Sequence, residues 1–372
     1  DFDPLNLQAL HFLEGNEENA HLSSNLDAHM QGDTLERLIG SIAIDSLDFY
    51  HHGVSYQQPR IELTSNLHND YAHVTLTSDQ VNADVYGDMS LKLLFQEFNE
   101  QIASRYVPSL VSNSQKHKNS VLGNRFSFSV NLSSTEALAK AFSLPISVVD
   151  TAQIDGYYYD EKGIFALNVA IDSLRLQQQY ITDSRLSIDN SGSDMLKLEL
   201  ASVYQPAPET DAFHLKLDAK ALNDKVDMEI GIQLDNKVPF AQSHSSHQFY
   251  RDESASLACQ SLLNIPYILW KDSEWQLDTT SIDYSQHKFY VHDFSFHHDD
   301  QFIRLDGCIS DQAEDTLNVN ISDIDLRSLT QLFPLKMNIP KPMLFGASWS
   351  AKAAVRALLG EFMLDADVKA EH

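Results

Sequence analysis

The feature that most constrains the fold of this chain is a short-range alternation of apolar and polar residues. It recurs along most of the sequence, and the polar positions are mostly Lys, Glu, Asp, Asn, Gln or Ser. Because successive side chains of a β-strand point to opposite faces, a period of about two predicts strands with one apolar and one polar face. The apolar positions of the clearest runs are Phe126, Phe128 and Val130; Leu196, Leu198 and Leu200; Met228, Ile230 and Ile232; and Leu317, Val319 and Ile321.

Turns rich in Asp, Asn, Ser and Pro separate these runs, as at 189–193 and 205–208. Such residues favour chain reversal because they form local hydrogen bonds or restrict the backbone. We expect roughly 20 strands, which is more than one closed sandwich or barrel usually contains. The sequence therefore predicts a mainly β, antiparallel protein.

Three segments predict short helices instead, at about 89–105, 135–142 and 326–333. In the first, apolar residues recur at helical spacing. Ser133 and Glu136 have the spacing of a capping box at the start of the second. A proline directly follows the third and ends it. A few short α-helices are therefore expected beside the strands.

The charge balance excludes several classes of partner. The 372 residues carry 53 acidic and 26 basic side chains, for a formal net charge of −27. Proteins bind nucleic acid and anionic membrane surfaces largely through Lys and Arg. Because acidic residues outnumber basic ones here, neither is expected as a partner. No apolar stretch reaches the roughly 18 residues that a membrane helix requires. No signal peptide opens the chain, and its abrupt start suggests a piece of a longer protein whose targeting or anchoring segment lies elsewhere.

The sequence offers little for catalysis or metal binding. It contains none of the motifs G-x-S-x-G, G-x-x-x-x-G-K-S/T, H-E-x-x-H or G-x-G-x-x-G. The best local metal candidate is the His-His-Asp-Asp run at 297–300, followed by His244 with His247. Adjacent side chains on a strand point apart, which favours a solvated turn for the first. We therefore predict no enzyme activity, no catalytic residue, no metal and no cofactor.

Two further local patterns each allow two interpretations. Glu274 lies between Trp270 and Trp275, which is compatible with a sugar-binding cleft that carries a carboxylate. Aromatic packing at a bend in the sheet is the favoured interpretation. Cys259 and Cys308 are the two cysteines, and they either form one disulfide bond or are two small buried residues.

Weak internal repetition is also present. Residues 43–49 resemble 170–176, and each stretch is followed by a polar turn and further alternating residues. Repetition of this kind predicts units of antiparallel strands that contact mainly their neighbours. The predicted repeat segments, each with one of the three helices, are 1–120, 121–253 and 254–372.

A longer ordered pattern runs from 265 to 332. Its elements are the residues at 265–266, 272–277, 282–283, 291–296, 301–307, 314–317 and 323–326. The stretch 132–176 has a related pattern, with elements at 136–138, 142–145 and 150–156. In this order the two stretches resemble the repeat unit of the TamB family, the AsmA-like inner-membrane subunits of the translocation and assembly module, in their Bacteroidetes form.

The resemblance implies an elongated, antiparallel repeating β-groove, which is an open sheet curled into a trough with an apolar lining. It implies a periplasmic protein tethered to the inner membrane by an anchor outside this chain. It also implies transport of phospholipid between the inner and outer membranes in support of outer-membrane assembly. The implied partners are phospholipid and an outer-membrane Omp85-type barrel protein.

The apolar positions of the four clearest runs are the expected groove lining. A continuous apolar lining shields acyl chains, because each buried CH₂ contributes roughly 0.8 kcal/mol. Three alternatives remain open. A second sheet could close over the apolar face as in a sandwich. The chain could be a scaffold or chaperone for outer-membrane β-proteins that pairs its edge strands with clients by β-augmentation. It could also be a carbohydrate-active β-protein.

Overall fold

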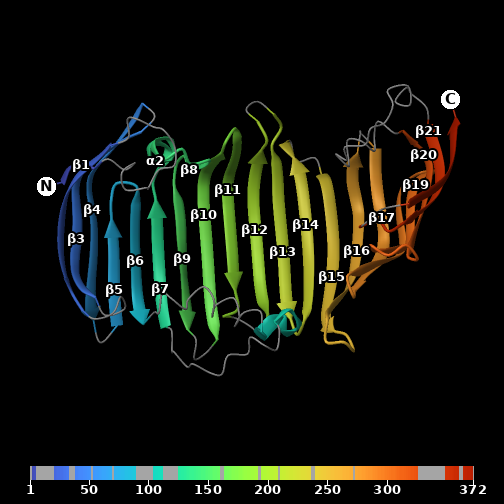
Figure 1. The fold of residues 1–372 in the computed structure, drawn as a ribbon, viewed down its shortest axis with the longest axis horizontal. Helices are drawn as coiled ribbons and strands as arrows, with labels where there is room; N and C mark the ends of the chain where they lie inside the picture. Colours follow the sequence, from blue (N-terminus) through green and yellow to red (C-terminus); the bar gives the residue numbers. More distant parts are fainter. Residues whose placement is uncertain are drawn as a thin grey trace. The chain divides into compact units, whose positions relative to one another are not determined.

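The computed structural model describes residues 2–5, 21–32, 38–51, 53–68, 71–88, 104–111, 125–159, 163–191, 194–207, 210–235, 239–270, 273–325, 348–359 and 363–371. Backbone contacts divide the chain into two units, 1–101 with 116–216 and 102–115 with 217–372. The strands belong to one open antiparallel sheet, so the predicted mainly β fold is confirmed (Figure 1).

The first unit contains twelve strands and one short helix among its described residues. They are β1 (Phe2–Leu5), β2 (His21–Gln31), β3 (Ile39–His51), β4 (Val54–His68), β5 (Tyr71–Thr77), β6 (Val81–Asp88), β7 (Arg125–Leu132), α2 (Glu136–Ala141), β8 (Ile146–Val148), β9 (Ala152–Tyr159), β10 (Ile164–Leu176), β11 (Gln179–Asp189) and β12 (Leu196–Gln205).

β13 (Phe213–Leu222) spans the boundary between the units. The second unit then consists of the short helix η2 (Pro108–Leu110), β14 (Lys225–Leu234), β15 (Pro239–Arg251), β16 (Leu257–Trp270), β17 (Ser273–Ser285), β18 (Lys288–His298), β19 (Gln301–Ile309), β20 (Thr316–Asp325), β21 (Ser348–Arg356) and β22 (Met363–Glu371).

Within each unit, strands that follow one another in sequence pair in antiparallel fashion. The exception is β10, which pairs with both β8 and β9 on one side while β7 pairs with β9. Several hairpins turn through residues of positive φ, including Asn223 and Asp224 between β13 and β14. Two-residue turns of this kind match the right-handed twist of the flanking strands, which explains the meander.

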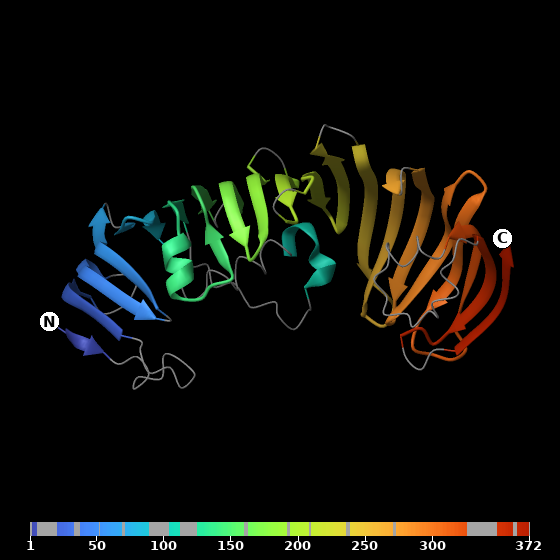
Figure 2. The same ribbon diagram turned by 90° about the horizontal axis from the view of Figure 1, so that it is seen from above.

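Four strands contain a residue of positive φ at a point where their pairing with one neighbour shifts. They are Ser46 in β3, Asp183 in β11, Asp293 in β18 and Asp323 in β20, with φ of 53°, 48°, 52° and 55°. Such bulges insert one extra residue and bend the strand. Asp tolerates the left-handed conformation better than most residues. Figure 2 shows the resulting curvature among the orange and red strands of the second unit.

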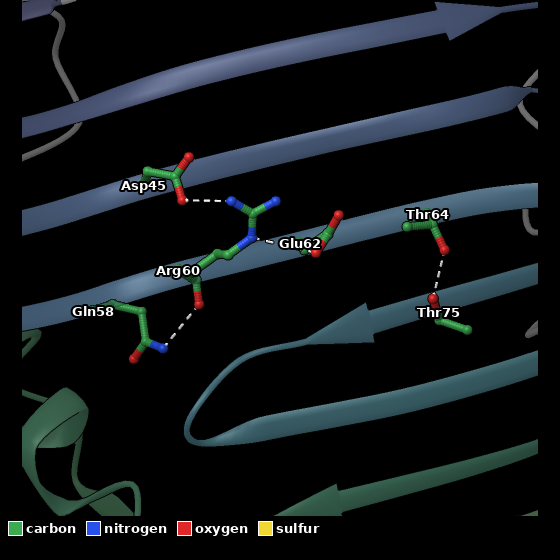
Figure 3. A network of polar contacts seen from close by, with 6 residues as sticks. All are labelled: Asp45, Gln58, Arg60, Glu62, Thr64 and Thr75. Atoms are coloured by element: carbon green, nitrogen blue, oxygen red, sulfur yellow. Dashed lines mark hydrogen bonds and ion pairs between the residues drawn. The ribbon is translucent and has the colours of Figure 1, made fainter.

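Buried polar side chains satisfy backbone carbonyls close to these irregularities. The Thr280 hydroxyl, 1% exposed, donates to the His292 carbonyl at 2.7 Å, next to the bulge at Asp293. In the first unit the Gln58 amide, also 1% exposed, donates to the Arg60 carbonyl at 3.1 Å (Figure 3). A bulge leaves some carbonyls without a ladder partner, and a buried orphan carbonyl is costly. These polar residues therefore stabilise the bends.

The predicted helix at 135–142 is confirmed as α2, but its predicted capping box is wrong. The N-cap is Thr135, and its side chain makes no capping hydrogen bond. The Thr135 hydroxyl instead accepts from the Val148 amide at 2.9 Å. Glu136 forms an ion pair with Arg175 at 2.7 Å instead of turning back to Ser133. Contacts with β8 and β10 thus replace the local cap.

The other two predicted helices fall largely outside the described residues. Of 89–105, the structure describes only the last two positions, and residues 104–106 are helical. The range 326–333 lies wholly outside the described residues. The three predicted repeat segments stay a prediction, since the division into two compact units does not test for repeats.

Candidate functional site: the apolar face of the sheet

The pairing register of the first unit places apolar residues opposite one another on strand after strand. One cross-strand row runs without interruption from β2 to β12. Its members are Ala28, Ile42, Leu63, Leu76, Ala83, Val130, Ile154, Val169, Leu186 and Leu200. Since direct partners in a sheet share a face, this row defines the apolar face of the first unit.

A parallel row on the same face contains further predicted lining residues. Its members are Val74, Val85, Phe128, Gly156, Leu167, Ile188 and Leu198. Gly156 is the small member, and a Cβ there would lie 2.9 Å from the Phe128 ring. The Phe128 ring therefore occupies the space that a side chain on β9 would take. Phe126 and Leu196 lie on the same face by strand alternation.

The second unit has its own apolar face. One row contains Ile265, Leu277, Phe296, Ile303, Ile321 and Ala351, from β16 to β21. A second row contains Val226, His247, Ser261, Ile282, Val291, Gly307, Leu317 and Val355, from β14 to β21. The remaining predicted residues of this unit, Met228, Ile230, Ile232 and Val319, alternate onto the same face. The structure thus places six of the twelve predicted residues on the apolar face of the first unit and six on that of the second.

Most of these side chains are only half-buried. Among the twelve, Phe126 at 6% exposed and Leu317 at 4% are the buried ones. Buried residues gather instead in local clusters, such as Trp275 with Ile324 and Phe49 with Tyr56 and Ala141. Because the described strands all belong to one sheet, a sandwich with a second covering sheet is not seen in the described part of the chain.

Helix α2 covers part of the apolar face in the first unit. Leu138 and Ala141 of the helix pack against Phe49 of β3 and Tyr56 of β4. The Phe142 ring stacks on that of Phe49, with centroids 4.4 Å apart. Figure 2 shows the helix on one side of the strands. The helix therefore lies on the same face as the predicted lining.

The opposite face carries charged and hydroxyl-bearing cross-strand pairs. Arg60 on β4 pairs with Asp45 on β3 at 3.0 Å and with Glu62 on its own strand at 3.3 Å (Figure 3). Thr64 and Thr75 share a 2.6 Å hydrogen bond between β4 and β5. These carboxylates raise the pKa of Arg60. Water screens exposed pairs of this kind, so they add little stability, and this face is a solvated surface.

The histidines proposed as metal candidates face different ways. His244 lies 4.0 Å from Glu229 on the polar face, whereas His247 lies on the apolar face. His297 pairs with Asp278 at 3.3 Å. His298 donates from Nδ1 to the Glu274 carbonyl oxygen at 2.8 Å and lies 3.5 Å from Asp299. Within the described ranges, no group of three or more His, Cys, Asp or Glu is arranged for a metal ion.

Trp275, the aromatic residue next to Glu274, packs against other side chains on one face of the sheet. Trp275 is 4% exposed, and its ring stacks on Phe296 with centroids 5.0 Å apart. Glu274 is exposed and alternates to the other face. The Trp275 ring and the Glu274 carboxylate therefore do not share a surface.

The two cysteines are free and buried. Cys259 lies on β16 opposite Tyr284, and Cys308 lies on β19 opposite Tyr290, so β17 and β18 separate them. Burial raises the pKa of the Cys308 thiol. The interpretation as two small buried residues is the one that fits this structure.

Sequence reasoning missed two features of this face. It did not find the bulges, although the alternation slips by one residue between Val291 and Phe294 and between Ile321 and Ile324. It also considered His247 only as the second metal candidate, beside His244, whereas the histidine interrupts an apolar row together with Ser261.

None of the helices in the described residues is long and apolar enough to span a bilayer. Comparison with protein-family models, with curated proteins and with solved structures found no match to this chain.

Proposed function

We propose that this chain is part of a periplasmic lipid-transport bridge whose apolar sheet face shields phospholipid acyl chains between the inner and outer membranes and supports outer-membrane assembly. The observation that carries the proposal is the uninterrupted apolar row of the first unit, from Ala28 to Leu200. Its members come from ten strands and line one face, and within the described residues no second sheet lies over that face.

The physical basis is that the face can bury acyl chains without holding them at one fixed site. Each CH₂ of an acyl chain removed from water contributes roughly 0.8 kcal/mol. Neighbouring strands lie about 4.8 Å apart, so a chain that moves along the row meets a similar apolar surface at every step. Such a surface binds acyl chains and still permits them to slide, with no bond chemistry involved.

The sequence resemblance to the TamB family supports the same proposal. It supplies the periplasmic location, the inner-membrane tether outside this chain and an outer-membrane Omp85-type partner. The apolar face supports the part of the proposal that concerns lipid binding.

Mass spectrometry of organic extracts from the chain, purified without detergent, tests the proposal. We expect co-purifying phospholipid in the wild type and its loss in Leu198→Arg with Ile230→Arg, which places a charge on the apolar face of each unit. The matched control is Ala201→Arg with Gln233→Arg, since these exposed residues lie on the polar faces of the same two strands. Lipid retained equally in both folded variants would refute the assigned face.

A scaffold function by β-augmentation is the second candidate, and the open sheet favours it. Among the described strands, β22 pairs only with β21 and so presents an edge. An edge strand offers unpaired backbone groups to an incoming strand. This function predicts binding of β-forming peptides that survives Leu198→Arg with Ile230→Arg, whereas lipid binding does not.

A further inference from the structure

A small polar cluster interrupts the apolar face of the second unit. Within the row from Val226 to Val355, His247 on β15 and Ser261 on β16 are adjacent, and Ser245 lies two residues before His247 on the same face. The surrounding positions on that face are Val226, Met228, Leu263 and Ile282. We name His247, Ser245 and Ser261 the β15 polar cluster.

The cluster is internally hydrogen-bonded through the imidazole. His247 Nδ1 lies 2.9 Å from Ser261 Oγ, and His247 Nε2 lies 3.0 Å from Ser245 Oγ. All three side chains are half-buried, so they remain accessible from the apolar face. Burial lowers the pKa of His247, which favours the neutral imidazole near neutral pH.

A neutral imidazole has one N–H donor and one acceptor nitrogen. One serine hydroxyl therefore donates to the ring, and the other accepts the ring N–H. The accepting serine keeps its own O–H available for another acceptor. Cys259 Sγ lies 3.5 Å from Ser261 Oγ, but sulfur is a weak acceptor. An oxygen acceptor on a ligand would form a stronger hydrogen bond with the cluster.

We infer that the β15 polar cluster is a subsite for the ester carbonyl of a diacyl lipid whose acyl chains lie on the adjacent apolar positions. The inference rests on the proposed lipid-binding function and adds a recognition site to it. An ester carbonyl is an uncharged acceptor at the junction of the acyl chain and the polar part of the lipid. It suits a cluster that has an uncharged donor and apolar residues on both neighbouring strands.

Binding of two matched lipids to the full chain tests the subsite. The probes are dioleoyl phosphatidylglycerol and its dialkyl ether analogue, which has the same head group and no ester carbonyls. We expect the wild type to bind the ester lipid about two- to tenfold more tightly, the effect of one net hydrogen bond. Ser245→Ala with Ser261→Ala should abolish this preference, and Ser243→Ala, on the same strand and face, should retain it.

The outcomes separate the subsite from the function. Equal binding of both lipids by the wild type overturns the subsite and leaves the apolar face as a lipid surface. A preference that survives in the double variant also overturns it. Binding of neither lipid, together with no uptake of the apolar probe N-phenyl-1-naphthylamine, overturns the subsite and the proposed function together. The wild-type comparison needs no variant, so misfolding of the double variant leaves the test intact.

Discussion

At the scale of single residues, a polar side chain on the apolar face can supply a hydrogen bond that its apolar neighbours cannot. Thr280 is 1% exposed on β17 and lies opposite Leu263. Its hydroxyl bonds the carbonyl of His292, beside the left-handed Asp293. The residue is polar because the bend exposes a carbonyl to an apolar environment.

Thr280→Val should therefore destabilise the chain although it matches the shape of threonine. Loss of the hydroxyl leaves the His292 carbonyl without this donor at a part-buried position, which costs about 1–3 kcal/mol. Thr280→Ser keeps the donor and should cost less. Urea unfolding followed by circular dichroism measures both, and a valine variant as stable as the wild type would contradict this role.

His247 gives a pH dependence of known sign. Because burial lowers its folded-state pKa below the ordinary value of 6.5, the unfolded chain takes up a proton first as pH falls. Its contribution to stability is present above about pH 6.5 and is lost as pH falls through the folded pKa. The free energy of unfolding should fall more from pH 7.5 to 5 in the wild type than in His247→Gln. Equal slopes would argue against the burial of this imidazole.

At the scale of elements, the strands could be predicted from sequence and their bends could not. The period of two placed the twelve lining residues on one face of each unit, because alternation survives any choice of partner. A bulge shifts the phase by one residue, so Val291 and Phe294 share a face although their spacing suggests otherwise. The cap of α2 was also mispredicted, because Glu136 forms an ion pair with Arg175, which lies far along the sequence, and not a local capping contact.

Substitution of Gly156 tests how closely β9 packs against its neighbouring strands on the apolar face. A Cβ at this position would lie 2.4 Å from the Ala166 carbonyl oxygen and 2.9 Å from the Phe128 ring. Gly156→Ala should therefore destabilise the chain by about 1–3 kcal/mol. Gly231→Ala is the matched control, because a Cβ there meets no atom within 4 Å, and it should be neutral or stabilising. Similar losses in both variants would show that the register around β9 is wrong.

At the scale of the whole molecule, each described strand pairs with its sequence neighbours, apart from the arrangement around β8 and β9. Stability in such a protein is approximately a sum of local contributions. Hydrogen exchange of the Thr280→Val variant should show faster exchange in β16 to β19 and unchanged exchange in β4 to β7. Uniformly faster exchange along the chain would indicate one cooperative body instead.

The row from Ala28 to Leu200 also has a consequence for how such a chain can evolve. Because each member pairs only with the strands on either side of it, duplication or deletion of one hairpin preserves the chain direction of the remaining strands. Each added hairpin widens the sheet by about 9.6 Å and extends the same lining. Duplication of the coding sequence for a hairpin can therefore change the length of the sheet in discrete steps. Selection would then act on the apolar character of the face as a whole and not on any individual position.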